Sequence, residues 1–152
     1  PEQIELEISE KAIFSDFDRV LVHLKRIYDS GIKIILDDFG TGYSSLTHLK
    51  HLPVSQIKID KSLIKDISQD LNNASVFQTL IELAHAFGIQ VIAKGAEYEN
   101  SVHALRRLGC DQAQGFFIAA PMQAHEFQHF MPTPETKLSV FINSKKVKET
   151  KG

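Results

Sequence analysis

Strand-like and helix-like segments alternate along most of this chain, and this alternation constrains the fold more than any other feature. Short apolar or alternating segments favour strands, and apolar residues at helical spacing favour helices. The expected strands are 4–8, 32–36, 56–59, 90–93 and 112–118. The expected helical segments are 17–28, 43–49, 62–67, 72–87, 99–108 and 124–130. Such alternation predicts βαβ units and a parallel sheet, either a doubly wound sheet or part of a (β/α) barrel.

Composition excludes several classes of protein. The chain has 152 residues and a net charge of -2, so its charge does not indicate a nucleic-acid or membrane partner. No apolar run reaches the length of a membrane span. The lone Cys110 excludes an internal disulfide and fits a reducing compartment, so we expect a cytoplasmic location.

The last twenty residues differ from the rest of the chain. Residues 133–152 carry five lysines against two glutamates. We therefore expect a folded body, 1–132, and a basic, flexible tail, 133–152. A frayed end is one interpretation of this tail. The other is that its apolar segment, 138–142, covers an edge of the sheet.

Two adjacent acids, Asp37 and Asp38, follow the apolar strand 32–36 and precede Gly40 and Gly42. Adjacent carboxylates are costly to hold together unless a cation neutralises them, and glycines let the chain pass close by. This pattern indicates a divalent-metal site at the end of a strand. The alternative is a helix N-cap, because acids also suit the start of a helix.

Other polar side chains recur where the expected strands end. In a parallel sheet the carboxyl ends of the strands lie at one edge, so these side chains can converge. Glu10 is interpreted as an ordinary first-turn residue of a helix. The complete set is Glu7, Glu10, Asp37, Asp38, Lys58, Asp60, Lys94, Glu97 and Gln114.

Five strings at these positions resemble, in order and spacing, the EAL domain family of bacterial cyclic di-GMP phosphodiesterases. The resemblance extends over about residues 3–130. The strings are ELEISE at 5–10, LDDFGTGYSSL at 36–46, IKID at 57–60, AKGAE at 93–97 and QGFF at 114–117.

The resemblance implies a TIM-like barrel that cleaves cyclic di-GMP to pGpG with Mg²⁺ or Mn²⁺. It places Glu7, Asp37 and Asp38 at metal-ligand positions. It also gives Lys58 the role of orienting the attacking water or balancing charge. Two cations can stabilise the attacking and leaving oxygens of such a displacement, and hard cations prefer carboxylate oxygens.

Further roles follow from the same resemblance. Glu97 is expected to hold the loop after Asp38, which shapes the dimer contact in the family. Gln114 is expected in the site near metal-bound water. Phe116 and Phe117 are candidates for lining a base pocket, with packing in the core as the alternative.

Two departures from the family pattern bear on activity. The Glu-Ala-Leu signature is absent from this sequence, so we expect the opening part of the barrel to be missing. Lys94 also stands where the family has a glutamate that binds metal or acts as a base. Its ammonium would repel a divalent ion and could pair with Asp37 or Asp38. A protonated lysine is not a base.

We therefore predict an α/β fold, a partial TIM-like (β/α) barrel of the EAL type. The predicted function is a truncated, degenerate EAL domain with little or no catalysis and a regulatory role in cyclic di-GMP signalling. One alternative is an active phosphodiesterase whose missing strands are supplied upstream or by a partner. The other is a protein-interaction module that binds no nucleotide.

A barrel that lacks its first strands is expected to associate with another chain. Ile35, Ile57 and Ile92 are expected to face the barrel interior and to meet water once the first strands are lost. We therefore expect a homodimer, or a partner protein that covers the gap. A separate pattern, His125-Glu126-x-x-His129, matches that of zinc proteases but has no obvious third ligand.

Overall fold

The computed structural model describes residues 4–40, 46–65 and 67–130. Its five strands form one parallel sheet in the order β1-β2-β3-β4-β5, which is also their order along the chain. A doubly wound sheet reverses its strand order partway, whereas a barrel does not. The strands are β1 (Glu5–Ser9), β2 (Lys33–Phe39), β3 (Gln56–Ile59), β4 (Gln90–Lys94) and β5 (Gln112–Gln114).

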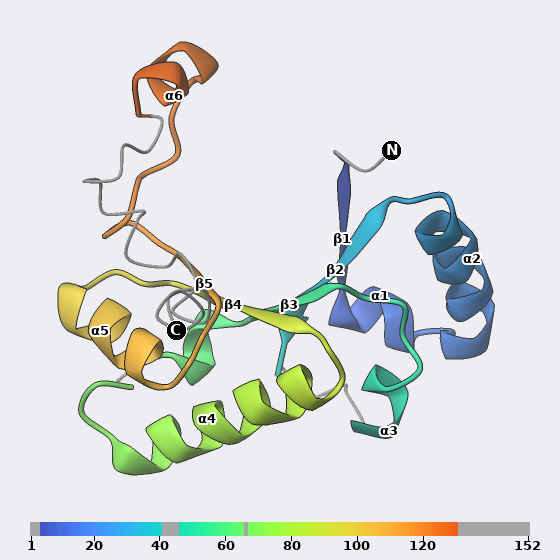
Figure 1. Ribbon diagram of the computed structural model, residues 1–152, viewed down its shortest axis with the longest axis horizontal. Coiled ribbons are helices and arrows are strands. Elements are labelled where there is room, and N and C mark those ends of the chain that lie inside the picture. Colours follow the sequence, from blue (N-terminus) through green and yellow to red (C-terminus); the bar gives the residue numbers. More distant parts are fainter. Residues whose placement is uncertain (1–3, 41–45, 66, 131–152) are drawn as a thin grey trace, which may run out of the picture.

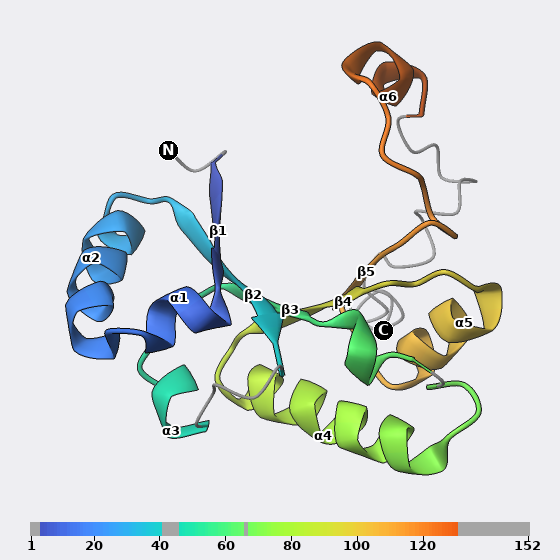
Figure 2. The same ribbon diagram turned by 180° about the vertical axis from the view of Figure 1, so that it is seen from behind.

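The helices lie mostly along one side of this sheet. Figure 1 shows α2, α4 and α5 following one another along that side, and Figure 2 shows the same arrangement from behind, with α6 standing away from the sheet. No described helix is long and apolar enough to span a membrane. The helices are α1 (Glu10–Phe14), α2 (Phe17–Asp29), α3 (Leu46–Leu49), α4 (Leu71–Ala86), α5 (Glu99–Arg107) and α6 (Ala124–Phe130), with a 3₁₀ turn, η1 (Lys61–Leu63).

Most of the predicted elements are present, with differences at their ends. The short helix α1 lies outside the expected helical segments, although Glu10 was interpreted as a first-turn residue; Ser9 starts this helix by accepting a hydrogen bond from the backbone N–H of Ala12. The strand expected at 112–118 ends at Gln114. Parts of two expected helical segments, 43–45 and 66, lie outside the described residues, as does the tail from 131.

The hydrophobic core lies between the sheet and these helices. Alternate strand residues point into it, and burying each such side chain contributes about 1.5–3 kcal/mol. The strand residues that are buried there are Ile34, Leu36, Ile57, Ile59, Val91 and Ala93, and the most buried helix residues are Ile13, Leu24, Phe77, Ile81 and Leu105.

The expectation that Ile35, Ile57 and Ile92 meet water was wrong, and Ile57 does not face the barrel interior. Ile57 points into the core, because it is the register partner of Leu36 and the neighbour of Lys58, whose side chain takes the opposite face. All three are buried, at 2%, 0% and 6% exposure, so none meets water.

Candidate functional site

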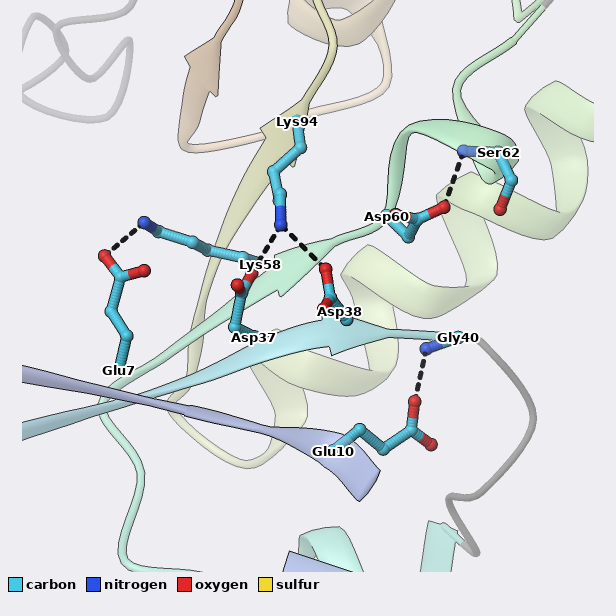
Figure 3. A network of polar contacts seen from close by, with 9 residues as sticks. All are labelled: Glu7, Glu10, Asp37, Asp38, Gly40, Lys58, Asp60, Ser62 and Lys94. Carbon is cyan, nitrogen blue, oxygen red and sulfur yellow. Dashed lines mark hydrogen bonds and ion pairs between the residues drawn. The ribbon is translucent and has the colours of Figure 1, made fainter. Parts of the chain in front are cut away.

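The acid pair lies at the carboxyl end of β2. Consecutive strand residues normally point to opposite faces, but Asp38 has a left-handed backbone with φ of 56°. The β2–β3 register also shifts between Leu36 and Phe39. This local break in the strand brings the Asp37 and Asp38 carboxylates to one side, where both meet the same partner (Figure 3).

That partner is Lys94, at the carboxyl end of β4. Its Nζ donates to Asp37 Oδ1 at 2.8 Å and to Asp38 Oδ1 at 2.7 Å. Partial burial lowers the pKa of Lys94, but the hydrogen bonds to Asp37 and Asp38 outweigh it and hold that pKa above its ordinary value. Lys94 is therefore an ammonium at neutral pH, and the predicted pairing with these acids is present.

A second lysine makes a parallel arrangement. Lys58 leaves β3 and its Nζ donates to Glu7 Oε1 on β1 (Figure 3). To reach Glu7 it must cross β2 near Ile35, which is the register partner of Glu7. The Lys58 side chain is only 12% exposed, and Ile35 itself is buried at 2% exposure. In both pairs the lysine reaches across one intervening strand in the direction of β1: Lys58 across β2, and Lys94 across β3.

These residues do not fit a divalent ion as they are arranged. An ammonium already takes one oxygen of Glu7, of Asp37 and of Asp38. Among the described residues, no group of three or more His, Cys, Asp or Glu side chains could hold a metal. Hard cations need several oxygen ligands, and a neighbouring ammonium repels them.

An open pocket of about 710 Å³ adjoins this cluster. Lys94, Glu97 and Gln114 line it, and so do two aromatic residues, Phe116 and Phe127. Phe116 is 68% exposed and Phe127 is 52% exposed. The pocket therefore has a polar floor at the strand ends and an apolar wall that extends to α6.

The other predicted site residues lie around this pocket. Glu97 is exposed, and its expected role of holding the loop after Asp38 stays a prediction, because residues 41–45 lie outside the described residues. Gln114 lines the pocket, and its expected place near metal-bound water stays a prediction. Of the two aromatics, Phe116 lines the pocket, whereas Phe117 packs against the hydrophobic core.

Sequence reasoning missed Glu10. This residue is fully buried at the start of α1, and its Oε2 accepts a hydrogen bond from the backbone N–H of Gly40 at 3.2 Å (Figure 3). Glu10 thus holds the backbone two residues after Asp38. A signal was available: Glu10 precedes the buried Ile13 by three residues, so both lie on one helix face.

The zinc-protease pattern has a structural explanation. Glu126 Oε2 accepts a hydrogen bond from the backbone N–H of Gln123 at 2.8 Å, which stabilises the start of α6. His129 Nδ1 lies 2.8 Å from the carbonyl oxygen of His125. The described residues supply no third ligand near these two histidines.

Comparison with known proteins identifies relatives of this chain. The EAL domain family model matches residues 1–121. The bifunctional diguanylate cyclase/cyclic di-GMP phosphodiesterase MucR of Pseudomonas aeruginosa is 38% identical over 126 residues, 83% of this chain and 18% of the relative. The cyclic di-GMP phosphodiesterase PA2567 of the same organism is 38% identical over 84% of this chain and 22% of the relative. The chain thus spans about a fifth of the length of these relatives.

Solved structures agree with the sequence comparison. The PaMucR phosphodiesterase in complex with c-di-GMP has a TM-score of 0.78 at 38% identity, covering 84% of this chain and 51% of that chain. The EAL domain of Mycobacterium smegmatis DcpA has a TM-score of 0.79 at 36% identity, covering 85% and 58%. The predicted α/β fold, part of a TIM-barrel-like fold, is confirmed. This chain belongs to the EAL domain family and is related to cyclic di-GMP phosphodiesterases.

Proposed function

We propose that this domain acts in cyclic di-GMP signalling as a regulatory element with little or no catalysis. The observation that supports this proposal is the Lys94 ammonium held between Asp37 and Asp38. It takes oxygens that a divalent ion would need, and it stands where the family has a glutamate.

The expected loss of rate follows from the chemistry. Phosphodiester cleavage assisted by two metal ions needs cations at both the attacking and the leaving oxygen, and a base or a metal to activate water. A lysine with a raised pKa is not a base at neutral pH. Losing one such electrostatic or proton-transfer group costs about 10² to 10³ in rate.

A second candidate is an active phosphodiesterase, with Mg²⁺ or Mn²⁺ bound weakly. The observation in its favour is that Asp37, Asp38, Lys58 and Gln114 lie toward the carboxyl ends of their strands, and that Glu7, midway along β1, meets Lys58. In this candidate the remaining strands of the barrel come from elsewhere, and a metal displaces the lysines. A protein-interaction module that binds no nucleotide remains the third candidate.

Turnover of cyclic di-GMP to pGpG decides between the first two candidates. The assay compares the wild-type chain with Lys94→Glu in Mg²⁺ and in Mn²⁺, by chromatography of the products. We expect no useful turnover by the wild type. The control is Lys25→Glu, which makes the same charge change on an exposed residue of α2. Wild-type turnover at a rate normal for enzymes would refute the proposal.

Association is a further part of the proposal, although its original reason, the exposure of three isoleucines, was wrong. The outer strands are β1 and β5, and β1 exposes Leu6 at 38%, next to Ile4 at 58%. Unpaired strand edges favour pairing with another chain, so self-association or a partner protein is still expected. Light scattering across a dilution series tests this, and a monomer at all concentrations would exclude self-association.

The remaining features of the proposal concern organisation and location. The family match ends at residue 121, and the boundary near 132 before a basic tail stays a prediction. Cys110 is free and buried. We propose a cytoplasmic location, because a lone thiol fits a reducing compartment.

A further inference from the structure

We propose that the basic tail of this chain binds back onto its own folded body. In this arrangement residues 138–142 lie along the outer edge of β5 and against the apolar wall of the 710 Å³ pocket. The occupant of this surface is thus a segment of the same chain. The proposal does not depend on whether the domain hydrolyses cyclic di-GMP.

The apolar wall of the pocket is exposed among the described residues. Phe116, which follows β5, is 68% exposed, and Phe127 on α6 is 52% exposed. The residues between them that also line the pocket are Ala119, Ala120, Pro121 and Met122. Contiguous exposed apolar surface usually marks a contact site. An apolar segment is therefore expected to cover this wall.

The strand β5 lies beside this wall and has a free edge. Among the described strands it pairs with β4 alone, and its last residue, Gln114, lines the same pocket. An extended peptide can add to such an edge through backbone hydrogen bonds, while its side chains fill neighbouring pockets. The surface therefore suits a short extended segment with apolar side chains.

The tail contains one segment of this kind. Residues 138–142 read LSVFI, and β-branched and aromatic residues favour strands. In an extended conformation the side chains of Leu138, Val140 and Ile142 share one face, because strand residues alternate. That face is entirely apolar and matches the wall of the pocket.

The charges of the pocket and the tail are complementary. Carboxylates outnumber lysines at the pocket and directly beside it: the acids are Asp37, Asp38, Asp60 and Glu97, and the cations are Lys61 and Lys94. Residues 133–152 carry five lysines against two glutamates. Opposite charges favour the approach of the tail, and salt screens this attraction. Binding of the tail should consequently weaken as the salt concentration rises.

The point at which the tail leaves the body also favours this site. The tail follows α6, which ends at Phe130, and Phe127 on the same helix lines the pocket. Leu138 is eight positions after Phe130, and eight extended residues span about 26 Å, enough for the chain to turn back. The other outer strand, β1, lies at the opposite end of the sheet (Figure 1). The tail is therefore expected at β5, which leaves β1 available to a partner.

Disulfide trapping in the full-length chain tests this arrangement. Ala120→Cys places a thiol in the pocket wall and Val140→Cys places one in the tail segment, while the native Cys110 is buried. The control pair is Ala86→Cys with Val140→Cys, because Ala86 is an exposed alanine at the end of α4 and does not line this pocket. The pocket pair should form a disulfide within one chain about tenfold faster than the control pair, since binding raises the local concentration of the thiols. Adding Glu97→Lys should slow it about twofold to fivefold.

Tryptophan fluorescence provides a second measurement that needs no cysteine. The chain has no tryptophan, so Ile142→Trp supplies a single reporter in the tail segment. Its emission should be blue-shifted, and adding Phe127→Ser should move it toward that of a residue in water. The control is Tyr28→Ser on α2, an exposed aromatic residue at 49% against 52% for Phe127, which should leave the emission unchanged.

Three outcomes would overturn the proposal. A disulfide that forms only between two chains would show that the tail of a second copy occupies the pocket. Equal rates for the pocket pair and the control pair would show that the tail does not bind there. If the cysteine variants do not fold, emission of Ile142→Trp that is the same with and without Phe127→Ser would exclude the contact.

Discussion

Glu10→Ala should destabilise the domain and loosen the chain that follows the acid pair. The Glu10 side chain is 0% exposed, and it accepts the N–H of Gly40, two residues after Asp38. A hydrogen bond to a charged group contributes about 1.5–3 kcal/mol, and each buried methylene contributes about 0.8 kcal/mol. Since the chain relaxes partly around the change, we expect a loss of about 2–4 kcal/mol in the free energy of unfolding. That is a large share of a margin of roughly 5–15 kcal/mol.

Urea unfolding followed by circular dichroism measures this change. Glu10→Gln serves as the matched variant, because it keeps the volume and an acceptor oxygen, and it should lose about half as much. Glu5→Gln is the surface control. Its side chain is 46% exposed, in a 3.8 Å ion pair with Lys33, so the effect should stay below about 0.5 kcal/mol. Equal stability of Glu10→Ala and wild type would show that the buried contact does not hold this segment.

Three further substitutions have distinct expected effects. Gly115→Ala would place its Cβ within 2.3 Å of the carbonyl oxygen of Ala96, so urea unfolding should show a loss of about 1–3 kcal/mol. Burial raises the pKa of Cys110 to about 12 from its usual 9.0, so stability should fall as pH rises above about 9, and Cys110→Ala should flatten that fall in unfolding midpoints measured between pH 8 and 11. The backbone N–H of Ser62 lowers the pKa of Asp60; Asp60→Ala should cost about 1 kcal/mol at pH 7, and this difference should shrink in acid unfolding as the pH falls below 3.8.

The sheet was largely predictable because its strands are short, apolar and regularly separated by helices. It was harder to predict which strand side chains point into the core and which point to the other face of the sheet. Ile57 is the example. It was expected to face the barrel interior together with Ile35 and Ile92, although side chains alternate along a strand and Lys58 is its direct neighbour. Counting by two from Lys58 would have placed Ile57 in the core.

The pairing of Lys94 with the acids was predictable from charge, but its geometry was not. The left-handed backbone of Asp38, at the register shift between β2 and β3, lets both carboxylates meet Lys94. The pairing of Lys58 with Glu7 spans 51 positions of sequence and an intervening strand. Glu10 was missed because a carboxylate in a first helical turn normally lies in solvent.

Calorimetric titration of Mn²⁺ into the wild type and Lys94→Glu tests the central claim, that the Lys94 ammonium takes the place of a metal at the acid pair. We predict weak binding by the wild type and clearly tighter binding by Lys94→Glu, because the substitution removes a repulsive charge and adds a carboxylate ligand. The control Lys25→Glu should bind Mn²⁺ as the wild type does. Equal affinities for wild type and Lys94→Glu would contradict the claim.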